Sequence, residues 1–123
     1  MAKSIKGILN QNKNFTVNGS IWMECDGQRF FGPGPVELLE RINKTGSINQ
    51  AAKQMQMSYK KAWEIINMLN TQAARPLVVT QTGGTSGGGS VITSEAIEII
   101  AWHKSLRERF KVFLEKETEK IGL

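Results

Sequence analysis

Four consecutive side chains in the middle of the chain can each donate a hydrogen bond: Ser58, Tyr59, Lys60 and Lys61. Hydroxyl, phenol and ammonium groups can contact phosphates, and lysine also reaches the acceptors on a guanine edge. Glu64, about one helical turn further on, can accept from the amino group of cytosine. This mixture, at helical spacing, is typical of a surface that contacts a nucleic acid.

A second group of polar side chains precedes this run and consists of Ser47, Asn49 and Gln50. They fall at the start of an expected helix, where backbone N–H groups and polar side chains suit a phosphate. The alternative is that both groups are solvated helix caps and solvated helix faces. For Gln50 and for Asn67 that alternative stays open.

Charge is distributed unevenly along the chain, whose formal net charge is +5. Between Lys44 and Arg75 five basic residues are opposed by one acidic residue, which leaves +4 in this segment. From Thr93 onward six basic and six acidic residues cancel. A local excess of cation favours a polyanion, because lysine and arginine release counterions from phosphates, although an acidic membrane surface would be favoured too.

Three helices are predicted around these polar residues. An apolar stripe follows Pro35 and ends at Gly46, which predicts the first helix. Ser47 and Ser58 are good N-caps and predict helices over 48–55 and from 59 to about 74. The last of these carries an expected buried set: Ala62, Trp63, Ile65, Ile66 and Leu69.

Hairpins are predicted on both sides of the helices. Residues 15–31 alternate and contain Asp26-Gly27, a strong turn signal because both positions of that turn need positive φ. After Pro76, the runs 77–81 and 90–92 predict a second hairpin with a glycine-rich loop at its tip. We therefore expect an α+β, mainly helical fold of the winged helix-turn-helix type, with an N-terminal β-hairpin and a long C-terminal helix.

The glycine-rich loop, Thr82–Gly89, superficially resembles a phosphate-binding P-loop. Against that pattern Gly89 occupies the lysine position, and the loop joins two strands instead of preceding a helix. As a wing it could approach a sugar-phosphate backbone closely, with Thr82, Thr85 and Ser86 as donors. A plain hairpin tip is the alternative.

No catalytic or metal-binding group is expected. Cys25 has no second thiol or nearby histidine in the sequence, and His103 is the only histidine, expected in a core or an interface. We expect no enzyme, no metal and no cofactor. The lone cysteine, and the absence of a signal peptide or a membrane-spanning run, predict a cytoplasmic protein with no membrane partner.

A long helix is predicted from Thr93 nearly to Lys120. Its apolar stripe suits packing against a twin helix, so a homodimer is expected through Ile99, Trp102, Leu106, Phe110 and Phe113. The alternative, which can hold at the same time, is that the stripe packs on the chain's own N-terminal hairpin.

Three motifs, TGSINQAAK, SYKKAW and TGGTSGGGSVIT, resemble in order and spacing the N-terminal DNA-binding domain of the ModE-type molybdate-responsive regulators, which is related to the LysR-type group. The resemblance covers about Gly32 to Ile100. It implies a dimer that binds a palindromic operator. It also implies DNA contacts from Ser47, Gln50, the run Ser58–Lys61, and the wing residues Thr82, Gly84, Thr85, Ser86 and Gly88.

In the full-length family, molybdate-binding β-barrel domains follow the long helix, whereas this sequence ends at Leu123. We therefore expect a stand-alone form without the molybdate sensor. The expected organisation is a flexible arm over 1–14, a winged helix-turn-helix domain over 15–92 and a dimerisation helix over 93–123.

The hypothesis drawn from the sequence is a transcription regulator that binds double-stranded DNA as a homodimer. A protein-interaction module on the same fold, with only non-specific DNA affinity, is the first alternative. A small-ligand sensor with a pocket near Trp22, Trp102 and His103 is the second, and only the aromatic content favours it.

Overall fold

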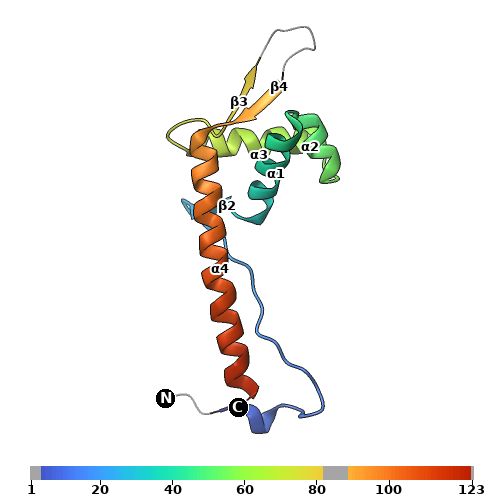
Figure 1. Cartoon of the computed structure of the whole chain (residues 1–123), viewed down its shortest axis with the longest axis vertical. Helices are drawn as coiled ribbons and strands as arrows, with labels where there is room; N and C mark the ends of the chain where they lie inside the picture. The colour runs from blue at the N-terminus through green and yellow to red at the C-terminus, as the bar shows by residue number, and fades with distance from the viewer. Residues whose placement is uncertain (1–3, 82–88, 123) are drawn as a thin grey trace. The chain divides into compact units, whose positions relative to one another are not determined.

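The computed structural model describes residues 4–81 and 89–122. They belong to two compact units, one formed by Trp22–His103 and the other by the residues before and after that range. The larger unit contains, in chain order, β1 (Met23–Cys25), β2 (Gln28–Phe31), α1 (Pro33–Thr45), α2 (Ile48–Gln54), α3 (Tyr59–Gln72), β3 (Val78–Gln81), β4 (Gly89–Ile92) and the start of α4 (Ser94–Gly122) (Figure 1). The predicted order of hairpin, three helices, hairpin and long helix is confirmed.

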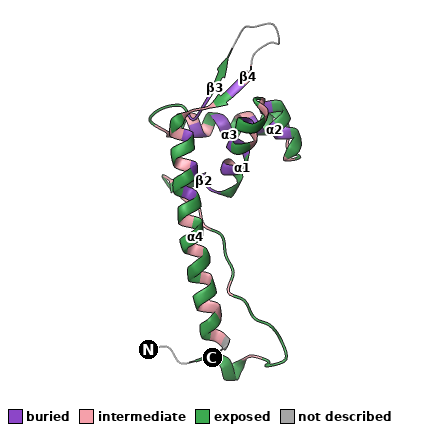
Figure 2. Cartoon of the chain, viewed as in Figure 1, coloured by how far each residue is buried: buried purple, intermediate pink, exposed green. Residues whose placement is uncertain are grey.

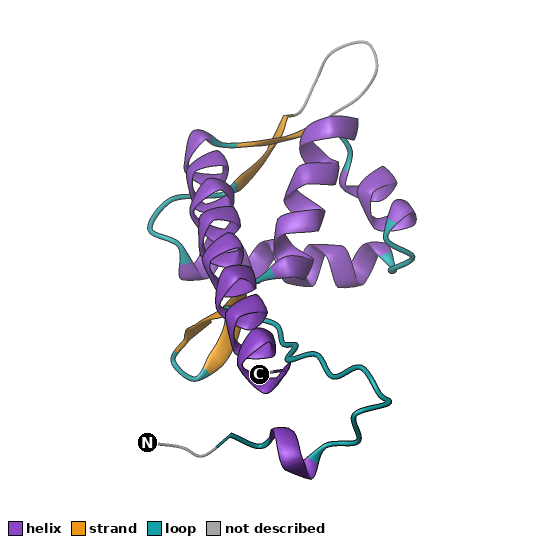
Figure 3. Cartoon of the chain, turned by 60° about the horizontal axis from the view of Figure 1, so that its bottom comes forward, coloured by secondary structure: helices purple, strands orange, loops and turns teal. Residues whose placement is uncertain are grey.

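The two hairpins form separate two-stranded antiparallel sheets (Figure 3). In the β1–β2 hairpin the turn residues Asp26 and Gly27 have φ angles of 52° and 80°, as the Asp-Gly signal predicts. In the second hairpin the pairs run from Val78 with Ile92 to Gln81 with Gly89.

The ends of the helices are set by local hydrogen bonds. Gly46 ends α1 with a φ of 70° and donates its N–H to Ile42 O over 2.7 Å. After α2, Gln56 adopts a φ of 56°, and Met57 N donates to Ala52 O over 3.0 Å, which is the 6→1 bond of a Schellman motif. α2 therefore turns directly into the cap of α3.

The start of α4 is tied to the loop before β3. The Thr93 hydroxyl accepts from Ala96 N over 3.2 Å and donates to Pro76 O over 2.9 Å. Glu95 lies in the first turn, and its pKa is lowered, chiefly by a hydrogen bond from its own backbone N–H and further by Ser94 and Arg75. The helix thus begins at a capped end that suits a carboxylate.

The apolar core lies within the larger unit, on residues from β2, all three short helices, β3 and the start of α4 (Figure 2). Phe31, Leu38, Leu39, Ile42, Ile66 and Leu69 are its largest fully buried apolar side chains. His103 is also fully buried and meets the ring of Phe31 edge-on, with 5.7 Å between centroids. Trp63 and Ile65, predicted to be buried, are only partly covered and pack at the margin of the core.

The smaller unit is described over residues 4–21 and 104–122. Its N-terminal part contains a short 3-10 helix, η1 (Lys6–Ile8), and is otherwise irregular. Val17 N donates to Thr118 Oγ1 over 2.8 Å, and a Cβ on Gly19 would lie 3.2 Å from the Phe110 ring. None of residues 4–21 and 104–121 is buried, so the described part of this unit has no core of its own.

Candidate nucleic-acid interface

The polar residues singled out from the sequence lie on the first turns of two successive helices. Ser47 caps α2 by accepting from Gln50 N over 3.1 Å, and Ser58 caps α3 by accepting from Lys61 N over 3.0 Å. Each cap satisfies one of the backbone donors that a helix leaves unpaired at its start. Both serine hydroxyls keep a proton that can be donated to another molecule.

An aromatic pair supports the first turn of α3. The Tyr59 ring stands edge-on to Trp63, one turn further along, with centroids 6.2 Å apart and planes at 89°. Tyr59 is 52% exposed, whereas Trp63 is packed against the core. Trp63 therefore supports one side of the Tyr59 ring and leaves the phenol available to a partner.

The charged groups of α3 lie close to the same turn. Lys60, Lys61 and Glu64 are all exposed, and Asn67 is exposed one turn later. Two ammonium groups within two residues of the helix start can reach phosphate oxygens without burying their own charge.

A pocket of about 340 Å³ joins these helix ends to the second hairpin. The start of α2, the first turns of α3, and the β3–β4 pair all contribute to its lining: Ser47, Ile48, Asn49, Tyr59, Trp63, Thr80, Gln81, Gly89 and Ser90. The lining combines hydroxyl and amide side chains with the apolar side chains of Ile48 and Trp63. Segments more than thirty residues apart in sequence thus present one continuous surface.

The predicted site residues fall into three groups. Ser47, Asn49 and Tyr59 line this pocket. The other predicted residues of α2 and α3 are on the same first turns or next to them, without lining the pocket: Gln50, Ser58, Lys60, Lys61 and Glu64. The wing residues lie outside the described residues: Thr82, Gly84, Thr85, Ser86 and Gly88.

Two exposed polar residues of the pocket, Thr80 and Gln81, and one buried polar residue, Ser90, were not predicted from the sequence. Thr80 and Gln81 lie at the end of β3. The polar end of the β-prone run 77–81 indicates that Thr80 and Gln81 face solvent. Their proximity to α2 and α3 depends on how the hairpin packs, which the sequence pattern does not give.

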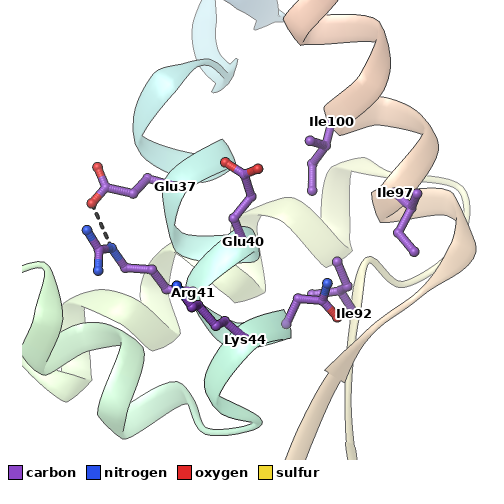
Figure 4. A pocket seen from close by; sticks show the side chains of 8 residues that line it. Glu37, Glu40, Arg41, Lys44, Ile92, Ile97 and Ile100 are labelled. Atoms are coloured by element: carbon purple, nitrogen blue, oxygen red, sulfur yellow. Dashed lines mark hydrogen bonds and ion pairs between the residues drawn. The ribbon is translucent and has the colours of Figure 1, made fainter.

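A second pocket, of about 610 Å³, lies between α1, β4 and the start of α4. Glu37, Glu40, Arg41 and Lys44 form one side of it, and Ile92, Ile97 and Ile100 another (Figure 4). Arg41 Nε contacts Glu37 Oε2 over 2.8 Å. Two acidic and two basic residues give this wall no net charge, so it is less suited to a polyanion than the first turn of α3.

Metal ligands, the cysteine thiol and membrane-spanning helices can also be assessed over the described part of the chain. No group of three or more metal-ligating side chains occurs among these residues. The thiol of Cys25 donates to Gln72 Oε1 over 2.9 Å. Over the same residues, no helix is both long and apolar enough to cross a membrane.

Three short helices followed by a β-hairpin, with polar first turns on α2 and α3, define a winged helix-turn-helix protein. This class presents the last helix of the three and the hairpin on one side of the domain. The pocket shared by α3, α2 and β3–β4 lies where those elements meet.

Several known proteins with similar sequences are named ModE. The chain is 40% identical over 87 residues to the molybdenum transport protein ModE of Azotobacter vinelandii, which is 71% of this chain and 32% of that protein. It is 44% identical over 71 residues to the transcriptional regulator ModE of Haemophilus influenzae, or 58% of this chain and 28% of that protein. It is 39% identical over 79 residues to the DNA-binding transcriptional dual regulator ModE of Escherichia coli, with shares of 64% and 30%.

The resemblance to ModE-type regulators is therefore confirmed over the matched part of the chain. The matched residues span less than a third of the length of these three relatives. No protein-family model matches the chain.

Proposed function

We propose that this chain is a sequence-specific regulator of transcription that binds double-stranded DNA. The observation that carries the proposal is the exposed first turn of α3, with Tyr59, Lys60 and Lys61, beside a pocket shared with α2 and β3–β4. Its similarity to proteins named as transcriptional regulators agrees with this function.

In this proposal α3 is the recognition helix and enters the major groove. Its N-terminal residues then meet base edges, as in other helix-turn-helix proteins. Lys60 and Lys61 contact guanine acceptors or phosphates, and Glu64 accepts from a cytosine amino group. Ser47, Gln50 and Ser58 contact phosphates from the starts of α2 and α3, and Tyr59 contacts phosphate or base.

The second hairpin contacts the sugar-phosphate backbone beside that groove. Its wing residues are assigned to this role by the family resemblance: Thr82, Gly84, Thr85, Ser86 and Gly88. Such contacts fix the orientation of the protein on the duplex and carry little sequence information of their own.

We further propose that the active form is a homodimer held by α4. The smaller unit has no buried residue over 4–21 and 104–121, while Trp102 and Phe113 are 43% and 54% exposed. Large aromatic side chains left in water favour association with a second copy. Two recognition helices about 34 Å apart then require a near-palindromic operator.

The test is to incubate the protein with sheared DNA from its own genome at about 150 mM salt and to sequence the retained fragments. We expect enrichment of a shared inverted repeat. Flat recovery, with affinity that disappears at moderate salt, would contradict sequence-specific binding and favour the protein-interaction module.

Replacing Lys60 and Lys61 together by Ala tests the placement of α3. We expect weaker operator binding and a salt dependence whose slope falls by roughly one for each phosphate that the protein no longer neutralises. Replacing Lys111 and Lys116 by Ala is the matched control, because both are exposed lysines of α4 and the change in net charge is the same. Equal affinities for the two variants would show that net charge, not α3, determines binding.

A further inference from the structure

One side chain of α3 holds the beginning of strand β3. Asn70 Oδ1 accepts from Leu77 N over 2.8 Å and from Val78 N over 3.2 Å, while Asn70 Nδ2 donates to Val78 O over 3.0 Å. The amide thus pairs with β3 in the way that a neighbouring strand would.

These hydrogen bonds are difficult to replace. Leu77 and Val78 are both 3% exposed, so their backbone N–H groups are far from water and need a partner. Only an amide at position 70 offers an acceptor and a donor in this geometry, and alanine offers neither.

The other strand of the hairpin has its own anchor on α1. Ser90 N donates to Gly46 O over 2.9 Å, and a Cβ on Gly89 would lie 3.2 Å from that same oxygen. The hairpin is therefore attached at two places, β3 to α3 and β4 to the end of α1. Without the Asn70 hydrogen bonds, β3 would be held only through its ladder with β4 and through the contacts of Thr93 with Leu77 and Pro76, so its distance from α3 would no longer be fixed directly.

Through β3, Asn70 near the end of α3 is linked to the pocket beside Tyr59 at the start of α3. Tyr59 and Asn70 are eleven residues apart in a continuous helix, which is roughly 16 Å at 1.5 Å per residue. From Val78, which Asn70 holds, the strand runs to Thr80 and Gln81, which line the same pocket as Tyr59. The position of these two polar side chains relative to the first turn of α3 depends on where Asn70 fixes β3.

We propose that Asn70 is a positioning residue for DNA binding, which fixes Thr80 and Gln81 so that they contact the DNA backbone beside the recognition helix. The inference rests on the proposed function, since it assigns two further contacts to the same interface. Asn70 itself does not touch DNA.

A double-mutant cycle on operator affinity tests this coupling. Replacing Thr80 and Gln81 together by Ala removes two hydrogen bonds and weakens binding about tenfold. Asn70→Ala misplaces the same two groups and weakens binding to a similar extent. The combined variant is then only about tenfold weaker than the parent, because the second change removes hydrogen bonds that the first has already broken.

The matched control is the cycle of Asn70→Ala with Gln50→Ala. Gln50 lies on α2 and does not depend on β3, so these two effects multiply. If Asn70 had a purely structural role, the effects of Asn70→Ala and of the Thr80 and Gln81 replacement would also multiply. The combined variant would then bind the operator about a hundredfold more weakly than the parent. That outcome would overturn the inference.

Asn70→Asp serves as the second variant if Asn70→Ala melts below the assay temperature. Its carboxylate keeps both accepted hydrogen bonds, which still hold Leu77 N and Val78 N, but it places its second oxygen against Val78 O. We therefore expect a lower unfolding free energy than in the parent, with operator affinity within about threefold of the parent. The Thr80 and Gln81 replacement still costs about tenfold in this background. Disappearance of that cost in Asn70→Asp would overturn the inference.

Failure of the inference and failure of the proposed function give different results. If the parent protein selects no shared DNA sequence, the proposed function is wrong and the inference is wrong with it. If the parent binds an operator and the Asn70 cycle is multiplicative, only the inference is wrong.

Discussion

At the scale of single residues, each capping serine has two roles. In both Ser47 and Ser58 the hydroxyl oxygen accepts a backbone N–H, which stabilises the helix that follows. The hydroxyl proton remains for a phosphate in the proposed complex. A serine-to-alanine change would therefore alter stability and binding together.

Ser58→Asp separates the role of this residue in helix capping from its proposed role in phosphate binding. Aspartate is as good an N-cap as serine, and its negative charge suits the start of α3, so the melting temperature should stay within about 2 °C of the parent. The same charge repels DNA phosphates, so operator binding should fall by at least tenfold. Thermal unfolding and a binding titration on the same samples measure both quantities.

Ser58→Ala is the companion variant. It lacks the cap, and we expect a decrease of about 1 kcal/mol in unfolding free energy with a smaller decrease in affinity. Unchanged operator binding by Ser58→Asp would place this turn away from the phosphates.

Some of the candidate site was predictable from single residues, and some was not. Ser47 and Ser58 were predicted as caps because a cap is determined by the few residues after it, and both caps are confirmed. Thr80 and Gln81 were missed because their contribution depends on the packing of the hairpin. Asn70 was missed for a related reason, since its partners are recognised only once α3 and β3 are side by side.

At the scale of elements, the turn between α2 and α3 is built on a residue that does not favour its conformation. Gln56 has a φ of 56°, whereas the end of α1 uses glycine for the same purpose at Gly46, with a φ of 70°. An L-residue in this left-handed region costs about 1 kcal/mol relative to glycine. The same left-handed helix ending is therefore formed by a glycine at position 46, which favours it, and by a glutamine at position 56, which does not.

Substitutions at these two positions should act in opposite directions. Gly46→Ala should lower the unfolding free energy by about 1 kcal/mol, because a Cβ there meets no atom within 4 Å and only the backbone conformation is penalised. Gln56→Gly should raise the unfolding free energy by about 0.5–1 kcal/mol. Chemical denaturation at constant pH measures both changes.

Gly7→Ala is the control, since Gly7 also has no atom within 4 Å of a Cβ and no positive φ is recorded for it. It should change stability little. A stabilising effect of Gly46→Ala would contradict the role assigned to the left-handed cap.

The boundaries of the helices and hairpins show which features sequence patterns predict correctly. The Asp26-Gly27 turn, the caps and the starts of α2 and α3 were predicted correctly because each depends on a local backbone preference. The end of α3 was predicted about two residues late, at Ala74 instead of Gln72. Helical periodicity also made Trp63 and Ile65 appear buried, since it gives the direction of a side chain but not how far the neighbouring elements extend.

At the scale of the whole molecule, α4 is buried only near its start. Its first residues contribute Ala96, Ile100 and His103 to the core, whereas none of residues 104–121 is classed as buried. Phe110 and Phe113 stack with centroids 6.2 Å apart, and Phe113 remains 54% exposed. A stacked aromatic pair with one exposed ring on a long helix is consistent with the proposed association of two copies.

Phe113→Glu should prevent that association. The side chain is exposed within a single chain, so the substitution should leave the larger unit folded, but it would place a charge inside the proposed dimer contact. We expect the parent to sediment as a dimer at micromolar concentration and Phe113→Glu to sediment as a monomer with weakened operator binding.

Lys111→Glu is the control, because it introduces the same acidic residue at an exposed polar position of the same helix. It should remain dimeric. A dimeric Phe113→Glu, or a monomeric parent, would contradict an association through this face of α4.

The lack of any buried residue over 4–21 and 104–121 also has a thermodynamic consequence. If a second copy supplies the cover, the order of these segments follows the law of mass action, and each tenfold dilution removes about 1.4 kcal/mol from the free energy that favours the assembled form. The amount of protein in the cell would then itself act as a signal. A newly made chain would fold its winged unit at once and acquire paired recognition helices only after enough copies had accumulated.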